Sequence, residues 1–246
     1  MSTTQEHQGS HGRDVGQKVS WEYHGRADAL VGTGATAAER ALSYGSAFVL
    51  MTLIVGADLM RENPIAVSGL QMALLAIFAF DIAGGAVANM LNSCKRLYHS
   101  RTRPEDGVLI RGLKNPILFT AIHIHPVVIA WALDGSVAVG VIWYLALQLA
   151  VWGVLAAPLY LRRPLATAMV MLAVAAEQLF LPLGAGLAWV IPALFLKMVL
   201  AHAVQEEPYA AQSKHTTSGG RTAAERAIAA VPHRERGRRD VDQLLR

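Results

Sequence analysis

The chain has 246 residues, of which 53% are hydrophobic and only 16% are charged, and its formal net charge is +4. A soluble domain carries about 25% charged residues, so too few charges remain here to cover a water-facing surface. The composition excludes a disordered chain and a collagen-like fibre, and the single cysteine, Cys94, excludes a disulfide-stapled mini-protein. These numbers predict an integral membrane protein.

The two ends of the chain are polar and differ from the centre in composition. Residues 1–41 predict a polar cytoplasmic tail, and residues 205–246 predict a basic, largely disordered cytoplasmic tail. Thr36 and Glu39 have the Thr-x-x-Glu spacing of a capping box, in which each side chain satisfies a free backbone N–H group. This spacing predicts that the first helix begins there.

The central residues 42–204 predict an all-α, polytopic transmembrane domain. A spanning helix needs about 20 mostly apolar residues, because the hydrocarbon core of a bilayer is about 30 Å thick. Six stretches meet this requirement: Leu42–Met60, Ile65–Asn92, Pro116–Leu133, Val137–Leu161, Leu165–Leu181 and Gly184–Val204. Pro64, Pro116 and Pro164 each stand at the expected start of a helix, where a missing backbone N–H costs nothing.

The charges between these stretches predict an orientation. Basic residues gather after the second and fourth stretches: Lys95, Arg96, Arg101, Arg103, Arg111, Lys114, Arg162 and Arg163. The first connection carries Arg61 beside Glu62, the third carries only Asp134, and the fifth carries no charge. Because basic connections stay in the cytoplasm, the alternation predicts a multi-pass protein of the cell membrane with both termini cytoplasmic.

The expected partners follow from where these basic residues lie. At the cytoplasmic face they would meet the anionic headgroups of the lipid bilayer. No stacking aromatic residues are interleaved with them, so nucleic acid is not expected as a partner.

Three charged residues, Asp81, Glu177 and Lys197, fall inside the predicted spans. A charge at the centre of a bilayer costs roughly 2.5–3.5 kcal/mol, so three unpaired charges would cost as much as a domain's whole stability. They must therefore face one another, a cavity or a bound ion. At about 1.5 Å per residue, Asp81 and Glu177 both lie about 20 Å from the cytoplasmic side. Lys197 is the cation placed to pair with either acid.

Polar residues also follow Asp81 along the second span. At 100° per residue, Gly85, Asn92 and His99 lie within about 40° of Asp81 if the helix continues. Together with Asn89 they predict either a polar track for a substrate or a small-residue packing face with hydrogen bonds.

The segment His123-Ile-His125-Pro126 is the candidate metal motif. Two imidazoles beside a carboxylate, here Asp81, are a usual ligand set for Zn²⁺ or iron. Residues two apart on a regular helix point about 200° apart, which opposes chelation. Pro126 removes one backbone hydrogen bond and predicts a distorted turn, which weakens that objection. The alternative is that one histidine faces the bundle and the other bonds a backbone carbonyl.

Three functions remain open, and the sequence does not decide whether the chain is an enzyme. The first is a membrane-embedded metal-dependent hydrolase or oxygenase for a lipidic or apolar substrate, with Zn or Fe on His123, His125 and Asp81. Glu177 would then be the general base or a further ligand, and Lys197 would steady an anionic intermediate. The second is a proton-coupled small-solute transporter, with a homodimer as its candidate assembly. The third is a non-catalytic membrane subunit whose polar groups hold the helices together.

Overall fold

The computed structural model describes residues 19–23 and 25–208, which form helices and no strand. Residues 1–18 of the predicted N-terminal tail, and the predicted C-terminal tail from residue 209 on, lie outside the described residues. The α-helices are α1 (Ala37–Leu59), α2 (Gly69–Ala79), α3 (Gly85–Ala88), α4 (Asn92–His99), α5 (Val108–Leu113), α6 (Pro116–Ala121), α7 (His125–Ala132), α8 (Val137–Ala156), α9 (Leu159–Leu179) and α10 (Val190–Phe195). Two π-helices, η1 (Phe80–Gly84) and η2 (Leu196–His202), join α2 to α3 and extend α10.

Four helical segments are long and apolar enough to cross a membrane. They are Ala37–Leu59, Gly69–Ala88, Val137–Ala156 and Leu159–Leu179, and each lies largely within a stretch that the sequence predicted to span. Two further apolar segments, Pro116–Ala132 and Val190–His202, match the remaining predicted stretches but are shorter than a usual spanning helix.

Large apolar side chains cover the outer faces of these helices. Leu53 of α1, Leu149 of α8 and Leu172 of α9 are 63%, 73% and 63% uncovered by other protein atoms. An apolar surface of this extent is unfavourable in water and matches the inside of a bilayer. The described fold is therefore that of a membrane protein.

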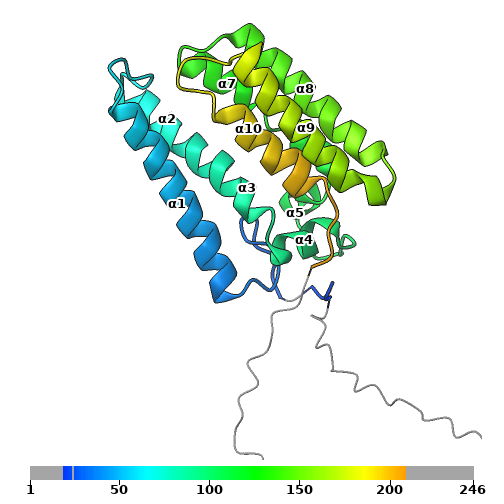
Figure 1. The fold of residues 1–246 in the computed structure, drawn as a ribbon. Helices are drawn as coiled ribbons and strands as arrows, with labels where there is room; N and C mark the ends of the chain where they lie inside the picture. The colour runs from blue at the N-terminus through cyan, green and yellow to red at the C-terminus, as the bar shows by residue number, and fades with distance from the viewer. Residues whose placement is uncertain (1–18, 24, 209–246) are drawn as a thin grey trace, which may run out of the picture. The chain divides into compact units, whose positions relative to one another are not determined.

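The helices form two groups with α10 and η2 between them (Figure 1). On one side α1 packs against α2, η1 and α3, and on the other side α8 packs against α7 and α9. The α10–η2 segment contacts both groups, since it meets η1 and α3 as well as α8 and α9. This arrangement places most of η2 in the interior of the bundle, and at the α6–α7 junction it buries His123 while Ile122 and Ile124 stay exposed.

Two capping boxes fix where the first two long helices begin. Thr36 and Glu39 form the predicted box at the start of α1, which confirms that prediction. Ser68 and Gln71 form a second box at the start of α2. The second helix therefore begins at Gly69, and the prediction that Pro64 stands at its start is wrong, because Pro64 lies in the connection before it.

The other two prolines also differ from each other. Pro116 occupies the first turn of α6, as predicted, with Asn115 as the capping residue. Pro164 lies inside α9, which begins at Leu159, so the prediction that it starts a helix is wrong. Pro158 is the capping residue of this helix, and Pro164 removes the backbone hydrogen bond to the Tyr160 carbonyl and crowds that carbonyl with its ring.

Because α9 begins early, Arg162 and Arg163 lie within the helix rather than in a loop. The Arg162 guanidinium donates hydrogen bonds to the carbonyl groups of Leu155 (2.9 Å) and Ala157 (3.1 Å). These carbonyls at the end of α8 lack intrahelical partners, so Arg162 satisfies them and closes the short α8–α9 connection.

Helix α4 folds its basic side chains inward. Lys95 is 1% exposed, and its ammonium group donates to the carbonyl of Ala201 and, at 2.8 Å, to that of Val204. It also lies 3.4 Å from a carboxylate oxygen of Glu206. Lys95 thus satisfies the carbonyl groups at the end of η2, and this buried side chain is unavailable to lipid headgroups in the described fold.

Residues 25–34 pack on α4 instead of extending as a tail. The Thr33 N–H group donates to the Ser93 carbonyl at 3.0 Å, and the Cys94 thiol lies 3.7 Å from the Leu30 carbonyl. Gly32 has a φ of +79°, and a Cβ atom there would lie 2.2 Å from the Ser93 carbonyl oxygen, so only glycine fits. Burial raises the pKa of the Cys94 thiol to about 12. Cys94 is therefore a packing residue rather than a reactive thiol.

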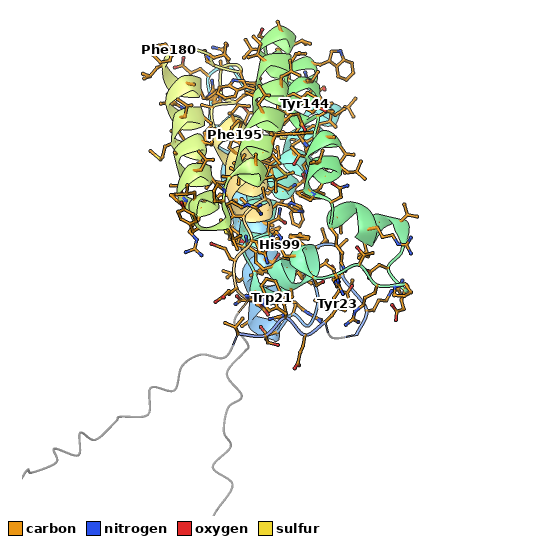
Figure 2. The ribbon with its side chains drawn as sticks, turned by 90° about the vertical axis from the view of Figure 1, so that its right-hand side faces the viewer. Trp21, Tyr23, His99, Tyr144, Phe180 and Phe195 are labelled. Carbon is orange, nitrogen blue, oxygen red and sulfur yellow. The ribbon has the colours of Figure 1, made fainter. Side chains whose placement is uncertain are left out.

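Aromatic residues mark the two ends of this bundle (Figure 2). Trp21 and Tyr23 lie with His99 at the end that holds α4, whereas Phe180 lies at the opposite end. The α4 end is the one that the basic residues predict to be cytoplasmic.

Candidate metal centre

Four of the predicted site residues meet in the bundle, and we call them the Asp81 cluster: Asp81, His123, His125 and Lys197. Asp81, His123 and His125 each offer one ligand atom, and these atoms all lie within 4.8 Å of one another. The Lys197 ammonium lies 2.8 Å from Asp81 Oδ2, and His125 Nε2 lies 3.1 Å from the same oxygen. The predicted pairing of Lys197 with an acid is confirmed, with Asp81 as the partner.

A break between α6 and α7 brings the two histidines together. Helix α6 ends at Ala121 and α7 begins at His125, so the intervening residues do not follow a regular helix. The ring centroids of His123 and His125 are 4.9 Å apart, and their planes meet at 34°. The distortion that Pro126 predicted is therefore present, and it removes the objection that residues two apart face opposite ways.

Side chains from α8 satisfy carbonyl groups at this break. The Gln148 amide donates to the Thr120 carbonyl at 3.1 Å, and the Tyr144 hydroxyl donates to the Ala121 carbonyl at 2.9 Å. Buried carbonyls without partners would destabilise the break, so α8 stabilises the conformation that pairs the histidines. Tyr144 (labelled in Figure 2) was not predicted, because nothing in its sequence spacing points to α6.

The surroundings of His123 assign its protonation. Its Nδ1 atom hydrogen-bonds the Phe119 carbonyl, and the side chain is nearly fully buried. A carbonyl only accepts, so Nδ1 carries the proton and Nε2 keeps a lone pair. Metal-binding histidines usually donate their second N–H to a carbonyl in this way. His123 thus bonds a carbonyl within its own segment and also offers a ring nitrogen to the cluster, a geometry compatible with metal binding.

His125 leaves one nitrogen without a partner. Its Nε2 atom faces Asp81, whereas its Nδ1 atom is buried and has no hydrogen-bond partner among residues 19–23 and 25–208. Buried polar atoms are rarely left unpaired in folded proteins. An unpaired imidazole nitrogen beside a carboxylate and a second imidazole fits a site that takes a metal ion.

Both π-helices carry a charged member of the cluster. Asp81 lies in η1 and Lys197 lies in η2, and such widened turns occur often at functional sites. Two glycines let the neighbouring groups approach. A Cβ atom at Gly84 would lie 2.3 Å from the Ala47 Cβ atom, and one at Gly85 would lie 2.7 Å from the Lys197 Cε atom. The Gly84-Gly85 pair therefore serves close packing, as predicted for small residues here.

The cluster is buried on one side and accessible on the other. The Lys197 side chain is 4% exposed and that of His125 is 18% exposed, whereas that of Asp81 is 43% exposed. Asp81 lines a cavity of about 80 Å³ between α1 and η1, with Ser43, Tyr44 and Ala47 on the α1 side. A small molecule or the end of a chain could therefore reach the cluster at Asp81.

Asn89 supports the helix that carries Lys197. Its amide nitrogen donates to the Lys197 carbonyl at 3.2 Å, and its amide oxygen accepts from the Tyr98 hydroxyl at 2.8 Å. Asn89 thus links α3, η2 and α4 and is a positioning residue for the cluster. Tyr98 could not be found from its spacing, because the contact depends on α4 turning back towards α3.

The predicted polar track along one helix is wrong in its geometry. The helix ends at Ala88, Leu91 is extended (φ −63°, ψ 144°), and α4 starts anew at Asn92. Asn92 and His99 therefore do not continue the face of Asp81. Asn92 instead lines a separate polar pocket of about 440 Å³ next to Lys95.

Glu177 lies apart from the Asp81 cluster. It is 1% exposed, and its Oε1 atom accepts a hydrogen bond from the Leu183 N–H group at 3.0 Å. It is not among the residues whose ligand atoms gather around Asp81. The depth of Glu177 along its helix does not bring it to the cluster, because the side chain faces the connection after α9.

Comparisons of the chain with protein-family profiles, with curated proteins and with solved structures give no match. The chemistry of the site therefore follows from its geometry alone.

Proposed function

We propose that the chain is a membrane-embedded metal-dependent enzyme, of hydrolase or oxygenase type, that acts on a lipidic or apolar substrate. The observation that carries this proposal is that ligand atoms of one carboxylate and two imidazoles lie within 4.8 Å of one another. The carboxylate comes from the π-helix η1, and the imidazoles come from the break between α6 and α7. This ligand set is that of catalytic zinc and non-haem iron sites, which keep coordination positions open. Zn or Fe held by Asp81, His123 and His125 would supply a Lewis acid.

The chain's own residues would orient the site. The Phe119 carbonyl holds the His123 ring in the orientation that presents Nε2. Lys197 fixes the Asp81 carboxylate through one oxygen and leaves Oδ1 without a described hydrogen bond. A buried ammonium at this position would also stabilise negative charge that develops on a substrate.

The access to the cluster supports a substrate from the bilayer. The cavity at Asp81 opens between α1 and η1, two helical segments that belong to membrane-spanning helices. An opening between such helices faces lipid rather than water, so the molecules that reach it are those dissolved in the bilayer.

We further propose six membrane crossings with both termini in the cytoplasm of a cell. The two shorter segments, Pro116–Ala132 and Val190–His202, complete the count, and the connections alternate between basic and nearly uncharged. Arg163 pairs through Nε with Glu206 at 3.0 Å, and because 66% of its side chain is uncovered, its guanidinium would also meet anionic headgroups at the cytoplasmic face.

Metal analysis of the purified full-length protein tests the proposal. After reconstitution with Zn²⁺ or Fe²⁺, the wild type should retain one metal ion per chain, and His123→Ala and His125→Ala should retain little. His99→Ala is the matched control, because His99 is half-buried in the same fold but lies outside the cluster. A wild type without Zn or Fe, or equal retention in all four proteins, would overturn the metal site.

A proton-coupled transporter is the second candidate, favoured by one observation. Lys197 and His125 both approach the same oxygen of Asp81, which makes three exchangeable groups in contact. Proton-coupled uptake by metal-free protein in proteoliposomes, abolished in Asp81→Asn, would favour this function over the enzyme.

A further inference from the structure

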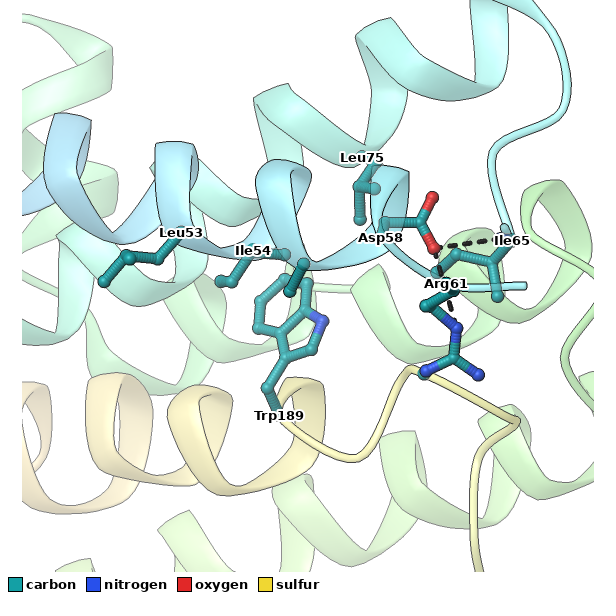
Figure 3. A pocket seen from close by; sticks show the side chains of 9 residues that line it. Leu53, Ile54, Asp58, Arg61, Ile65, Leu75 and Trp189 are labelled. Carbon is teal, nitrogen blue, oxygen red and sulfur yellow. Dashed lines mark hydrogen bonds and ion pairs between the residues drawn. The ribbon is translucent and has the colours of Figure 1, made fainter. Parts of the chain in front are cut away.

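A further pocket, which we call the Trp189 pocket, lies where α1 ends, far along the bundle from α4 (Figures 1 and 3). It has a volume of about 210 Å³, and none of its lining residues belongs to the Asp81 cluster. Leu53, Ile54 and Leu75 form apolar walls, and the connection before α10 closes the far side. The pocket is therefore separate from the proposed metal centre.

The acid in this pocket is already satisfied. Asp58 is 4% exposed, and its two oxygens accept hydrogen bonds from the N–H groups of Ile65 (2.9 Å) and Ala66 (3.1 Å). Asp58 thus holds the α1–α2 connection in place and shapes the wall of the pocket. The nearest side-chain donor, Arg61 Nε, lies 4.0 Å from Asp58 Oδ1 and is therefore only weakly engaged by this acid.

Two donors in the pocket lack strong acceptors. The Trp189 indole nitrogen is buried and has no hydrogen-bond partner among the described residues, and it lies on the side of the ring that faces Arg61 (Figure 3). The contacts of Arg61 use Nε alone, at 3.5 Å from the Asn63 carbonyl and 4.0 Å from Asp58. Its two terminal nitrogens have no described partner. The pocket therefore has unsatisfied donors beside apolar walls.

The backbone positions the Arg61 side chain at the mouth of the pocket. Gly186 has a φ of +80°, and a Cβ atom there would lie 3.1 Å from the Arg61 Cζ and Nη1 atoms. Only a glycine both adopts this conformation readily and leaves room for the guanidinium group. The Arg61 side chain remains 40% exposed, so it is accessible to a ligand.

We infer that the Trp189 pocket binds the phosphate group of a membrane phospholipid. An arginine fork matches phosphate oxygens, and a buried indole N–H requires an acceptor. The pocket volume is below that of a usual whole-ligand site, so it fits a headgroup and the start of a chain. The remaining chain continues along Leu53, which is 63% exposed on the lipid-facing side of α1. Arginine and tryptophan at a helix end are typical of the membrane interface, where phosphates lie.

Native mass spectrometry of the full-length protein in detergent, titrated with dioleoylphosphatidylglycerol, tests this site. The wild type should bind one lipid saturably. Arg61→Gln and Trp189→Phe should each weaken that binding about tenfold or more, the effect of losing one hydrogen bond to a charged group. Trp152→Phe is the matched control, since Trp152 faces outward on α8 with 58% of its surface exposed and should change nothing.

The outcomes separate the alternatives. Equal lipid binding by the wild type and both donor variants would overturn the site. Displacement of the lipid by inorganic phosphate alone would overturn the lipid as the ligand and assign the pocket to a soluble anion. If Arg61→Gln does not fold, Trp189→Phe decides alone, because phenylalanine keeps the apolar wall and removes only the donor and part of the ring.

Discussion

The Lys197 ammonium lies 2.8 Å from the Oδ2 atom of Asp81, although 116 positions separate the two residues in the chain. The two partners are buried unequally, since the lysine side chain is 4% exposed and the aspartate side chain is 43% exposed. The lysine therefore depends on the acid for charge compensation more than the acid depends on the lysine. This inequality makes the pair a sensitive test of what the cluster contributes to the fold.

Removal of one partner should cost more than removal of both. Asp81→Asn should lower the free energy of unfolding by about 3–5 kcal/mol, because it leaves a buried ammonium without its counter-charge. Lys197→Met should cost less, because Asp81 is more exposed. The double variant should be more stable than Asp81→Asn alone. Denaturant unfolding of chelator-treated protein in detergent measures all four proteins, and strictly additive losses would contradict the pairing.

The two adjacent glycines should respond differently to alanine. Gly84→Ala should destabilise by about 1–3 kcal/mol, because the new Cβ meets the Cβ and Cα atoms of Ala47, which cannot move aside. Gly85→Ala meets the flexible end of Lys197, so it should cost less stability and displace the lysine from Asp81. Thermal unfolding would compare the two variants. The expectation fails if Gly85→Ala proves the more destabilising.

Lys95→Met should loosen the end of η2. The substitution leaves the buried carbonyls of Ala201 and Val204 unpaired, at a cost of about 1–3 kcal/mol for each unsatisfied group. Hydrogen exchange should then increase at the end of η2 and remain unchanged in α1. Glu206→Gln is the control, because it removes the ion pairs with Lys95 and Arg163 and leaves both carbonyl contacts of Lys95 intact. Unchanged exchange in Lys95→Met would show that the carbonyls find other partners.

His99 should make the fold sensitive to acid. Burial, with the nearby charge of Lys95 as a smaller cause, lowers the pKa of His99 from 6.5 to about 4. Between these two values the unfolded state binds more protons than the folded state, so stability falls as the pH decreases through this range. His99→Asn should reduce that fall, because asparagine does not titrate in this range. Whatever the substitution changes at pH 7, the variant should lose less stability than the wild type between pH 7 and pH 5. Melting temperatures measured at pH 7 and pH 5 test this, and parallel losses in both proteins would exclude His99 as the cause.

The histidine pair shows what a sequence can reveal about this site. His123, His125 and Pro126 lie within four positions, so local rules of backbone geometry were enough to predict a distorted turn, and they left shared metal binding as one of two alternatives. The partner carboxylate, Asp81, was found from the high cost of a charge in lipid, and so was Lys197. Both arguments need only the chain itself and the thickness of a bilayer.

The predictions that were wrong depended on tertiary structure rather than on local sequence. Depth along a helix placed Glu177 level with Asp81, but it carries no information on rotation about the axis, and the side chain faces Leu183. The track to Asn92 and His99 assumed a continuous helix, yet the chain leaves the helix after Ala88 with no proline or glycine at positions 89–91 to signal the change. Tertiary packing decides both features.

The burial of Cys94 has a practical consequence for any spectroscopic study. This thiol, the single one in the chain, is fully covered and resists ionisation at neutral pH. Maleimide dyes or spin labels would therefore leave the native protein unmarked without prior removal of Cys94. A cysteine introduced on the outer side of α1 would then be the one labelled position. A second introduced cysteine on another helix would allow distances between the two labels to report how the helices move.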